Sequence, residues 1–194
     1  MQHAFNAAGT ASLAGVDGLT LTGNLAARVN TTGGAVNKTI TLPNGETVAV
    51  QFGATEAAAV FQGTVTATVA QFATVTGSFA ASKSDSKLTI AAAGVTAQVG
   101  TSDLGVKVTD GQLGVVVKTD TKKFAAVASG NAALEGVDGL TVTGSGAIRI
   151  NRLGEAITET ISTPAGNVTV DFSATTDVTQ IRSTLNLQFQ NYVY

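Results

Sequence analysis

The chain has 194 residues, 44% of them hydrophobic and 12% charged, and carries a net charge of −2; this balance argues against disorder and against a nucleic-acid partner. It has no cysteine and one histidine, His3, which excludes disulfides, thiolate metal sites and catalytic or metal sites built on several histidines. Its acidic residues are scattered through turns and no apolar run is long enough to cross a membrane, so we predict neither an enzyme nor membrane insertion.

The first clear predicted element is a strand over residues 19–30, where hydrophobic and polar residues alternate. Such alternation is typical of a strand with one buried and one solvent-facing side. A slip of one residue would expose the whole apolar side, so the register is expected to be firmly set. The side expected to be buried contains Leu19, Leu21, Gly23, Leu25, Ala27 and Val29, and the opposite side contains Thr20, Thr22, Asn24, Ala26, Arg28 and Asn30.

Further strands follow in chain order. Alternation predicts a strand over 48–52 and continues through 65–79, and four shorter strands are expected at 88–90, 95–99, 106–108 and 113–117. One short helix is predicted near 55–61, with Thr55 as its N-cap. Turns are expected where Gly, Pro, Asn and Asp cluster, at 16–18, 32–34, 43–45, 83–86 and 109–111. The spacing indicates about ten strands per repeat.

The strongest pattern is internal repetition. Residues 9–45 align without gaps to residues 130–166, a shift of 121, with 20 of 37 positions identical. We therefore predict a first unit over residues 1–123 and a partial second unit over residues 124–194, as in an excerpt of a longer array. The repeat signature consists of Gly15, Val16, Asp17, Gly18, Leu19, Arg28 and Asn30 in the first copy, and of Gly136, Val137, Asp138, Gly139, Leu140, Arg149 and Asn151 in the second.

These elements predict an all-β fold with a repetitive, mostly antiparallel architecture. One arrangement that fits the period is an elongated array, either β-solenoid-like or of stacked β-sandwiches, in which each unit is covered by its neighbours. A string of separate β domains also fits and remains open. Inward-facing residues are small, as at Gly23, Ala27, Ala67 and Ala97, so the layers are expected to lie close together.

The repeated residues include candidate binding sites. Asp17 and Asp138 offer hard oxygen ligands for calcium, although neither has a second acid at i+2 or i+4, and a structural turn is the favoured interpretation. No other cofactor is expected. Arg28 and Arg149, each followed two residues later by Asn, could bind a carboxylate or a glycan; a contact that keeps an exposed sheet face soluble is favoured.

Two residue types also have a functional and a structural interpretation. Runs of exposed threonine could order water and bind ice, but Thr is also simply a good strand residue. The aromatic residues could stack on sugars, but are predicted to be core anchors. The runs are Thr20/Thr22, Thr39/Thr41, Thr64/Thr66/Thr68, Thr74/Thr76 and Thr141/Thr143; the aromatics are Phe5, Phe52, Phe61, Phe72, Phe79, Phe124, Phe172 and Phe189.

Several phrases resemble repeats of very large bacterial surface or secreted proteins of the haemagglutinin-like, adhesin-like type. They are GTASLAGVDGLTLTGNLAARVNTTGGAVNKTI, VTGSFAAS, GVTAQVGTSDLGVKVTDGQLGVVV and SGNAALEGVDGLTVTGSGAIRIN. The resemblance covers nearly the whole chain and implies an extracellular or cell-surface location and a modular, stalk-like role. It transfers no functional residue, and the calcium-binding nonapeptide is missing.

The leading hypothesis is a structural spacer whose partners are neighbouring repeats of the same chain. Three alternatives remain open: a glycan- or protein-binding adhesin module, a self-assembling, filament-forming β protein that associates through unpaired strand edges, and a lipid-binding groove lined by small residues.

Overall fold

The computed structural model is all-β. Every regular element in the described part of the chain is a β-strand, and none is a helix. The predicted fold class and its mostly antiparallel character are therefore confirmed. The structure describes residues 2–13, 19–54, 59–69, 73–84, 86–101 and 104–190.

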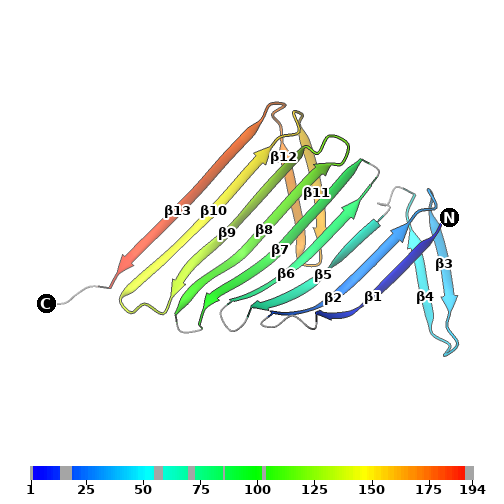
Figure 1. Cartoon of the computed structure of the whole chain (residues 1–194), viewed down its shortest axis with the longest axis horizontal. Helices are drawn as coiled ribbons and strands as arrows, with labels where there is room; N and C mark the ends of the chain where they lie inside the picture. Colours follow the sequence, from blue (N-terminus) through cyan, green and yellow to red (C-terminus); the bar gives the residue numbers. More distant parts are fainter. Residues whose placement is uncertain are drawn as a thin grey trace.

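Nine strands form one antiparallel sheet, in which neighbours in the sheet follow the order of the chain (Figure 1). Short turns connect most of these strands, as expected for antiparallel neighbours. β1 and β13 are the two edges of the sheet as described. The strands are β1 (Ala4–Leu13), β2 (Leu19–Asn30), β5 (Ala59–Val69), β6 (Ala73–Lys83), β7 (Lys87–Gly100), β8 (Gly105–Lys118), β9 (Phe124–Glu135), β10 (Leu140–Asn151) and β13 (Val178–Phe189).

Two hairpins leave the sheet, one after β2 and one after β10. The first pairs β3 (Val36–Thr41) with β4 (Thr47–Phe52), and the second pairs β11 (Ile157–Thr163) with β12 (Gly166–Phe172). The β11–β12 hairpin lies across one face of β6, β7, β8 and β9 (Figure 1). The β3–β4 hairpin lies at the other end of the sheet, where β4 contacts β1.

The backbone pairing of the first copy returns in the second. Leu19 of β2 pairs with Val69 of β5, and Leu140 of β10 pairs in the same way with Phe189 of β13. β9 to β13 thus repeat the arrangement of β1 to β5. The hairpin tip differs by one residue: five residues separate the paired Thr41 and Thr47, whereas four separate Ser162 and Asn167.

The second hairpin packs on one face of the sheet, and the two faces therefore differ in burial. We call the side on which β11–β12 lies the hairpin face, and the opposite side the apolar face. The core is formed where large hairpin residues meet small sheet residues, and it spans both copies because β11–β12 covers β6 to β8 as well as β9. Its buried members are Ala80, Ala91, Ala93, Val116, Ala125, Leu153, Ile161, Val168, Val170 and Phe172.

The alternating residues of the hairpins are buried on their apolar side, as at Val50, Phe52, Val170 and Phe172. For residues 19–30 and their copy at 140–151, in contrast, the burial expected from alternation is wrong. The side predicted to face solvent carries Asn30 and Asn151, which are 8% and 0% exposed. On the apolar face, in contrast, Ile148 and Ile181 are exposed. Alternation correctly separates the two faces of a strand but does not say which face another element covers. The side chains of Leu19 and Leu21 lie outside the described residues.

Two strands continue where the sequence predicted interruptions: one between residues 90 and 95, and one at the turn predicted for residues 109–111. The segments 88–90 and 95–99 belong to one strand, β7, and 106–108 and 113–117 to another, β8. The register shifts in both, at Gly94 (φ 59°) and Asp110 (φ 54°), which marks β-bulges. The 109–111 segment is therefore a bulge within β8, and the first copy has eight described strands instead of about ten.

The helix predicted near 55–61 is also wrong for residues 59–61, the part of it that the structure describes. Residues 59–61 belong to β5, where Ala59 and Phe61 pair with Val29 and Ala27 of β2. The strand ladder satisfies their backbone groups and outweighs local helix propensity. Residues 55–58, including Thr55, lie outside the described residues.

Candidate functional site

The candidate site is the contact between the β11–β12 hairpin and the sheet. Val168 and Val170 of β12 lie directly over Gly114 of β8. A Cβ atom added at Gly114 would lie 2.8 Å from Val170 Cγ2 and 2.9 Å from Val168 Cγ1. The glycine therefore allows the two layers to approach closely. Ala91 and Ala125, both fully buried, contribute small side chains to the same surface.

Two ion pairs connect the hairpin region to the sheet. Lys87 Nζ of β7 lies 2.7 Å from Glu159 Oε2 of β11. Lys118 Nζ of β8 lies 2.6 Å from Glu155 Oε1 in the loop before β11. All four side chains are partly exposed, so each pair contributes little to stability, but the pairs set which residues face one another.

Each repeated arginine holds its own hairpin against the sheet. The guanidinium carbon of Arg149 lies 4.8 Å from the centre of the Phe172 ring, and Nη2 donates a hydrogen bond of 2.5 Å to the Asp171 carbonyl oxygen. Arg28 repeats this arrangement with Phe52, also at 4.8 Å, and with the Gln51 carbonyl oxygen. The planar guanidinium makes both contacts at once. These arginines therefore have partners within the chain, on the covered hairpin face.

Each repeated asparagine shapes the loop between the sheet and the hairpin. Asn151 Nδ2 donates to the Glu155 carbonyl oxygen at 2.9 Å, and its Oδ1 accepts from the Leu153 N–H at 2.9 Å. In the first copy Asn30 donates to the Gly34 carbonyl oxygen at 2.8 Å and accepts from the Thr32 N–H at 3.0 Å. The Arg-x-Asn spacing thus marks the start of each hairpin, a role that the sequence alone did not reveal.

The Gly-Val-Asp-Gly segment of the second copy is the turn between β9 and β10. Gly136 and Gly139 have φ angles of 83° and 74°, which glycine adopts readily. The Leu140 N–H donates to the Val137 carbonyl oxygen at 3.1 Å. No group of three His, Cys, Asp or Glu side chains that could hold a metal is found in the described residues, which include Asp138. Asp17 and the rest of residues 15–18 lie outside them.

Threonines on the hairpin face form short cross-strand hydrogen bonds. Thr64 pairs with Ser78 at 3.0 Å, and Thr66 with Thr76 at 3.1 Å. These hydroxyls therefore bond to each other across β5 and β6, a normal stabilising arrangement in a sheet.

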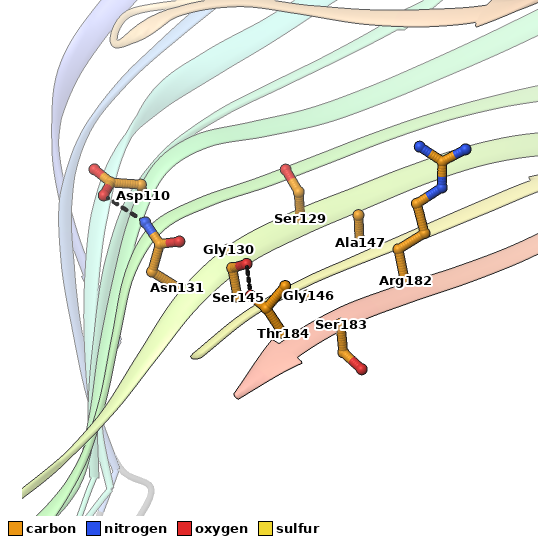
Figure 2. Close-up of a pocket in the computed structure, with 10 residues that line it drawn as sticks. All are labelled: Asp110, Ser129, Gly130, Asn131, Ser145, Gly146, Ala147, Arg182, Ser183 and Thr184. Carbon is orange, nitrogen blue, oxygen red and sulfur yellow. Dashed lines mark hydrogen bonds between the residues drawn. The ribbon is translucent and has the colours of Figure 1, made fainter. Parts of the chain in front are cut away.

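A shallow polar hollow of about 360 Å³ lies on the hairpin face over β8, β9, β10 and β13 (Figure 2). Asn131 Nδ2 donates to Asp110 Oδ2 at 3.0 Å, and the hydroxyls of Ser145 and Thr184 are 2.7 Å apart. Arg182 stands on the other side of the hollow (Figure 2). The hollow offers hydroxyl, amide and charged groups to a polar solute.

The apolar face exposes large side chains over most of the sheet. Ile181 and Phe189 of β13 are 73% and 69% exposed. Among the described aromatics, Phe52 and Phe172 are the buried anchors that the sequence predicted, whereas four others are exposed: Phe5, Phe61, Phe124 and Phe189. Phe72 lies outside the described residues. An exposed apolar surface of this extent is unusual for an isolated soluble domain.

Sequence patterns did not point to the small residues under the hairpin, Gly114 and Ala125, or to the Lys87–Glu159 pair. The one signal was the run of alanines at 91–93, because alanine side chains are too small to fill a core unless another layer lies close to them.

No helix in the described part of the chain is both long and apolar enough to cross a membrane. Comparisons with protein-family models, curated proteins and solved structures found no match.

Proposed function

We propose that this chain is a structural repeat segment, a stalk or spacer, of a large bacterial cell-surface or secreted adhesin-like protein. One observation carries the proposal: the hairpin of the second copy lies over strands of the first copy, so the core crosses the junction between units. When one unit covers the apolar surface of the next, the units stabilise one another, which is typical of a repeat array with a structural role.

Two further features support a structural role. The main sheet continues without interruption from the first copy into the second, through the pairing of β8 with β9. The most distinctive repeated side chains, Arg28 with Asn30 and Arg149 with Asn151, contact their own hairpins. We infer that the pattern extends along an elongated, repetitive array, for which the solenoid-like form remains a proposal.

The test is unfolding of proteins that contain one, two and three units, followed by circular dichroism in urea. Coupling through the junction predicts that the unfolding midpoint rises with unit number, because each added unit covers a surface of the previous one. Equal midpoints would mean that the units fold as independent domains and would refute coupled stacking.

Self-association is a second candidate function, favoured by the exposed apolar face and by the two edge strands. β1 and β13 each have a main-chain edge without a neighbouring strand in the described sheet, and such edges pair readily with other chains. Light scattering over a range of concentrations tests this candidate. A monomer at the highest concentration would exclude it.

A further inference from the structure

The β3–β4 hairpin has the same design as β11–β12 but lacks the surface that β11–β12 covers. Ile161 of β11 is 6% exposed, whereas the equivalent Ile40 of β3 is 53% exposed. Leu42, near the tip of the first hairpin, is exposed as well. The Arg28 and Asn30 contacts that hold this hairpin are nevertheless complete. The first hairpin is therefore positioned but only partly covered.

We infer that β3–β4 docks on strands of the β6–β8 type, contributed by another repeat that is paired to the free edge of β1. The template is the second copy, in which β12 contacts β9, the adjacent strand β8 and the next strand β7, while β11 contacts β7 and β6. β4 already contacts β1, the counterpart of β9. Strands added beside β1 in the order found beside β9 would therefore lie directly beneath β3–β4.

A second copy of this same molecule does not supply that surface in its present form. Its β6–β9 hairpin face is already covered by its own β11–β12, with Ala91 and Ala125 fully buried. The occupant must therefore be a repeat whose β6–β8 strands are still uncovered. This inference rests on the proposed structural-repeat function and specifies the partner of one surface.

Charge restricts the partner further. Glu159 of the second hairpin forms an ion pair with Lys87. The equivalent residue of the first hairpin is Lys38: Glu159 pairs with Val170 within its hairpin, and Lys38 pairs with Val50 within its own. A partner strand with lysine at the position of Lys87 would place two ammonium groups together. The complementary repeat is therefore expected to carry an acidic residue there.

In the test, a copy of residues 59–122 replaces Met1 and precedes Gln2, which adds β5 to β8 before β1. Because the repeat shift is 121, residue 122 is equivalent to residue 1, and the added β8 leads into β1 as β8 leads into β9 in the chain. The chain has no cysteine, so Ile40→Cys and Ile161→Cys each give a single thiol that is smaller than the residue it replaces. The readout is the rate of labelling by a maleimide.

In the unextended chain the thiol at position 40 should label rapidly and that at position 161 slowly. In the extended chain labelling at position 40 should slow by about tenfold or more, because it then requires local opening. Changing Lys87 of the added copy to Glu should slow it by roughly a further two- to fivefold, the range of a half-exposed ion pair. Gly114→Leu in the added copy should restore rapid labelling.

Hydrogen exchange of the β1 amides shows independently whether the added strands pair with β1. If they pair and the thiol at position 40 still labels rapidly, the inference is wrong, and it is equally wrong if they do not pair. Protection at position 161 serves as the control that the rest of the chain is folded. Unfolding midpoints that rise with unit number, together with rapid labelling at position 40, would reject this docking while leaving the structural-repeat function standing.

Discussion

The two hairpins share their register and their arginine and asparagine contacts, and differ in what lies beneath them. β11–β12 covers β6 to β9, and Val168 and Val170 are among its buried residues. β3–β4 contacts β1 at the edge of the sheet and exposes Ile40 and Leu42. Val50 and Phe52 of the first hairpin are buried like Val170 and Phe172 of the second, so the contacts that position each hairpin are local. Burial at the isoleucine position, in contrast, depends on strands of a neighbouring unit.

The largest expected difference is between truncations of the equivalent isoleucines. Ile161→Ala should lower the free energy of unfolding by about 2–5 kcal/mol, because it leaves a cavity in the core. Ile40→Ala should change it by less than about 0.5 kcal/mol, as is usual for an exposed position. Urea denaturation measures both. Equal losses would mean that β3–β4 is covered in solution.

A methyl group added under the second hairpin should be nearly as damaging. Gly114→Ala brings a Cβ atom against Val168 and Val170 and should destabilise the protein by about 1–3 kcal/mol through overpacking. Gly146→Ala on β10 is the matched control, because the nearest atom to its added Cβ, the Arg182 carbonyl oxygen, is 4.0 Å away. Thermal unfolding of the two variants compares them. Similar melting temperatures would contradict the close approach of hairpin and sheet.

The asparagines should behave alike in both copies, in contrast to the isoleucines. Asn30→Ala and Asn151→Ala each leave loop N–H and carbonyl groups without their partner, which costs about 1–3 kcal/mol for a buried group. The measurement is chemical denaturation with hydrogen exchange of the Thr32 and Leu153 amides. A loss confined to Asn151 would show that the loop depends on the covering layer.

The smallest effect concerns the Lys87–Glu159 ion pair of the second hairpin, which has no counterpart at Lys38 among the described residues. A double-mutant cycle with Lys87→Ala and Glu159→Ala should give a coupling energy of about 0.2–1 kcal/mol, because both side chains are partly exposed. The coupling should weaken as salt is added. Lys38→Ala in the first hairpin should leave stability unchanged. A coupling that is insensitive to salt would contradict an electrostatic origin.

Much of the strand pattern could be predicted from sequence. Residues 19–30 form a strand as expected, and the alternating residues at 48–52 lie in β4. Asp-Gly at 110–111 gave the same local signal for a turn and for a bulge, because both need a positive φ. Only the pairing partners on both sides of β8 distinguish the two.

The candidate site was harder to predict, because it depends on contacts between residues distant in the chain. Repetition identified Arg28 and Arg149 as important, but their partners, Phe52 and Phe172, lie 24 and 23 residues further along the chain. Ala91 and Ala125 gave no signal of their own, since a small residue is equally common on an uncovered face. A sequence pattern fixes what a strand presents on each side, and tertiary packing decides which side is covered.

The continuity of the sheet across the junction has a mechanical consequence. Six strands of the first unit enter the main sheet, so at a spacing of about 4.8 Å each unit would widen a continued ribbon by roughly 29 Å. Tension along that direction acts on the hydrogen bonds between strands, which can break one after another. The β8–β9 boundary has an additional restraint, because β11–β12 must detach before those two strands separate. Load-bearing strength would therefore be concentrated where successive units overlap.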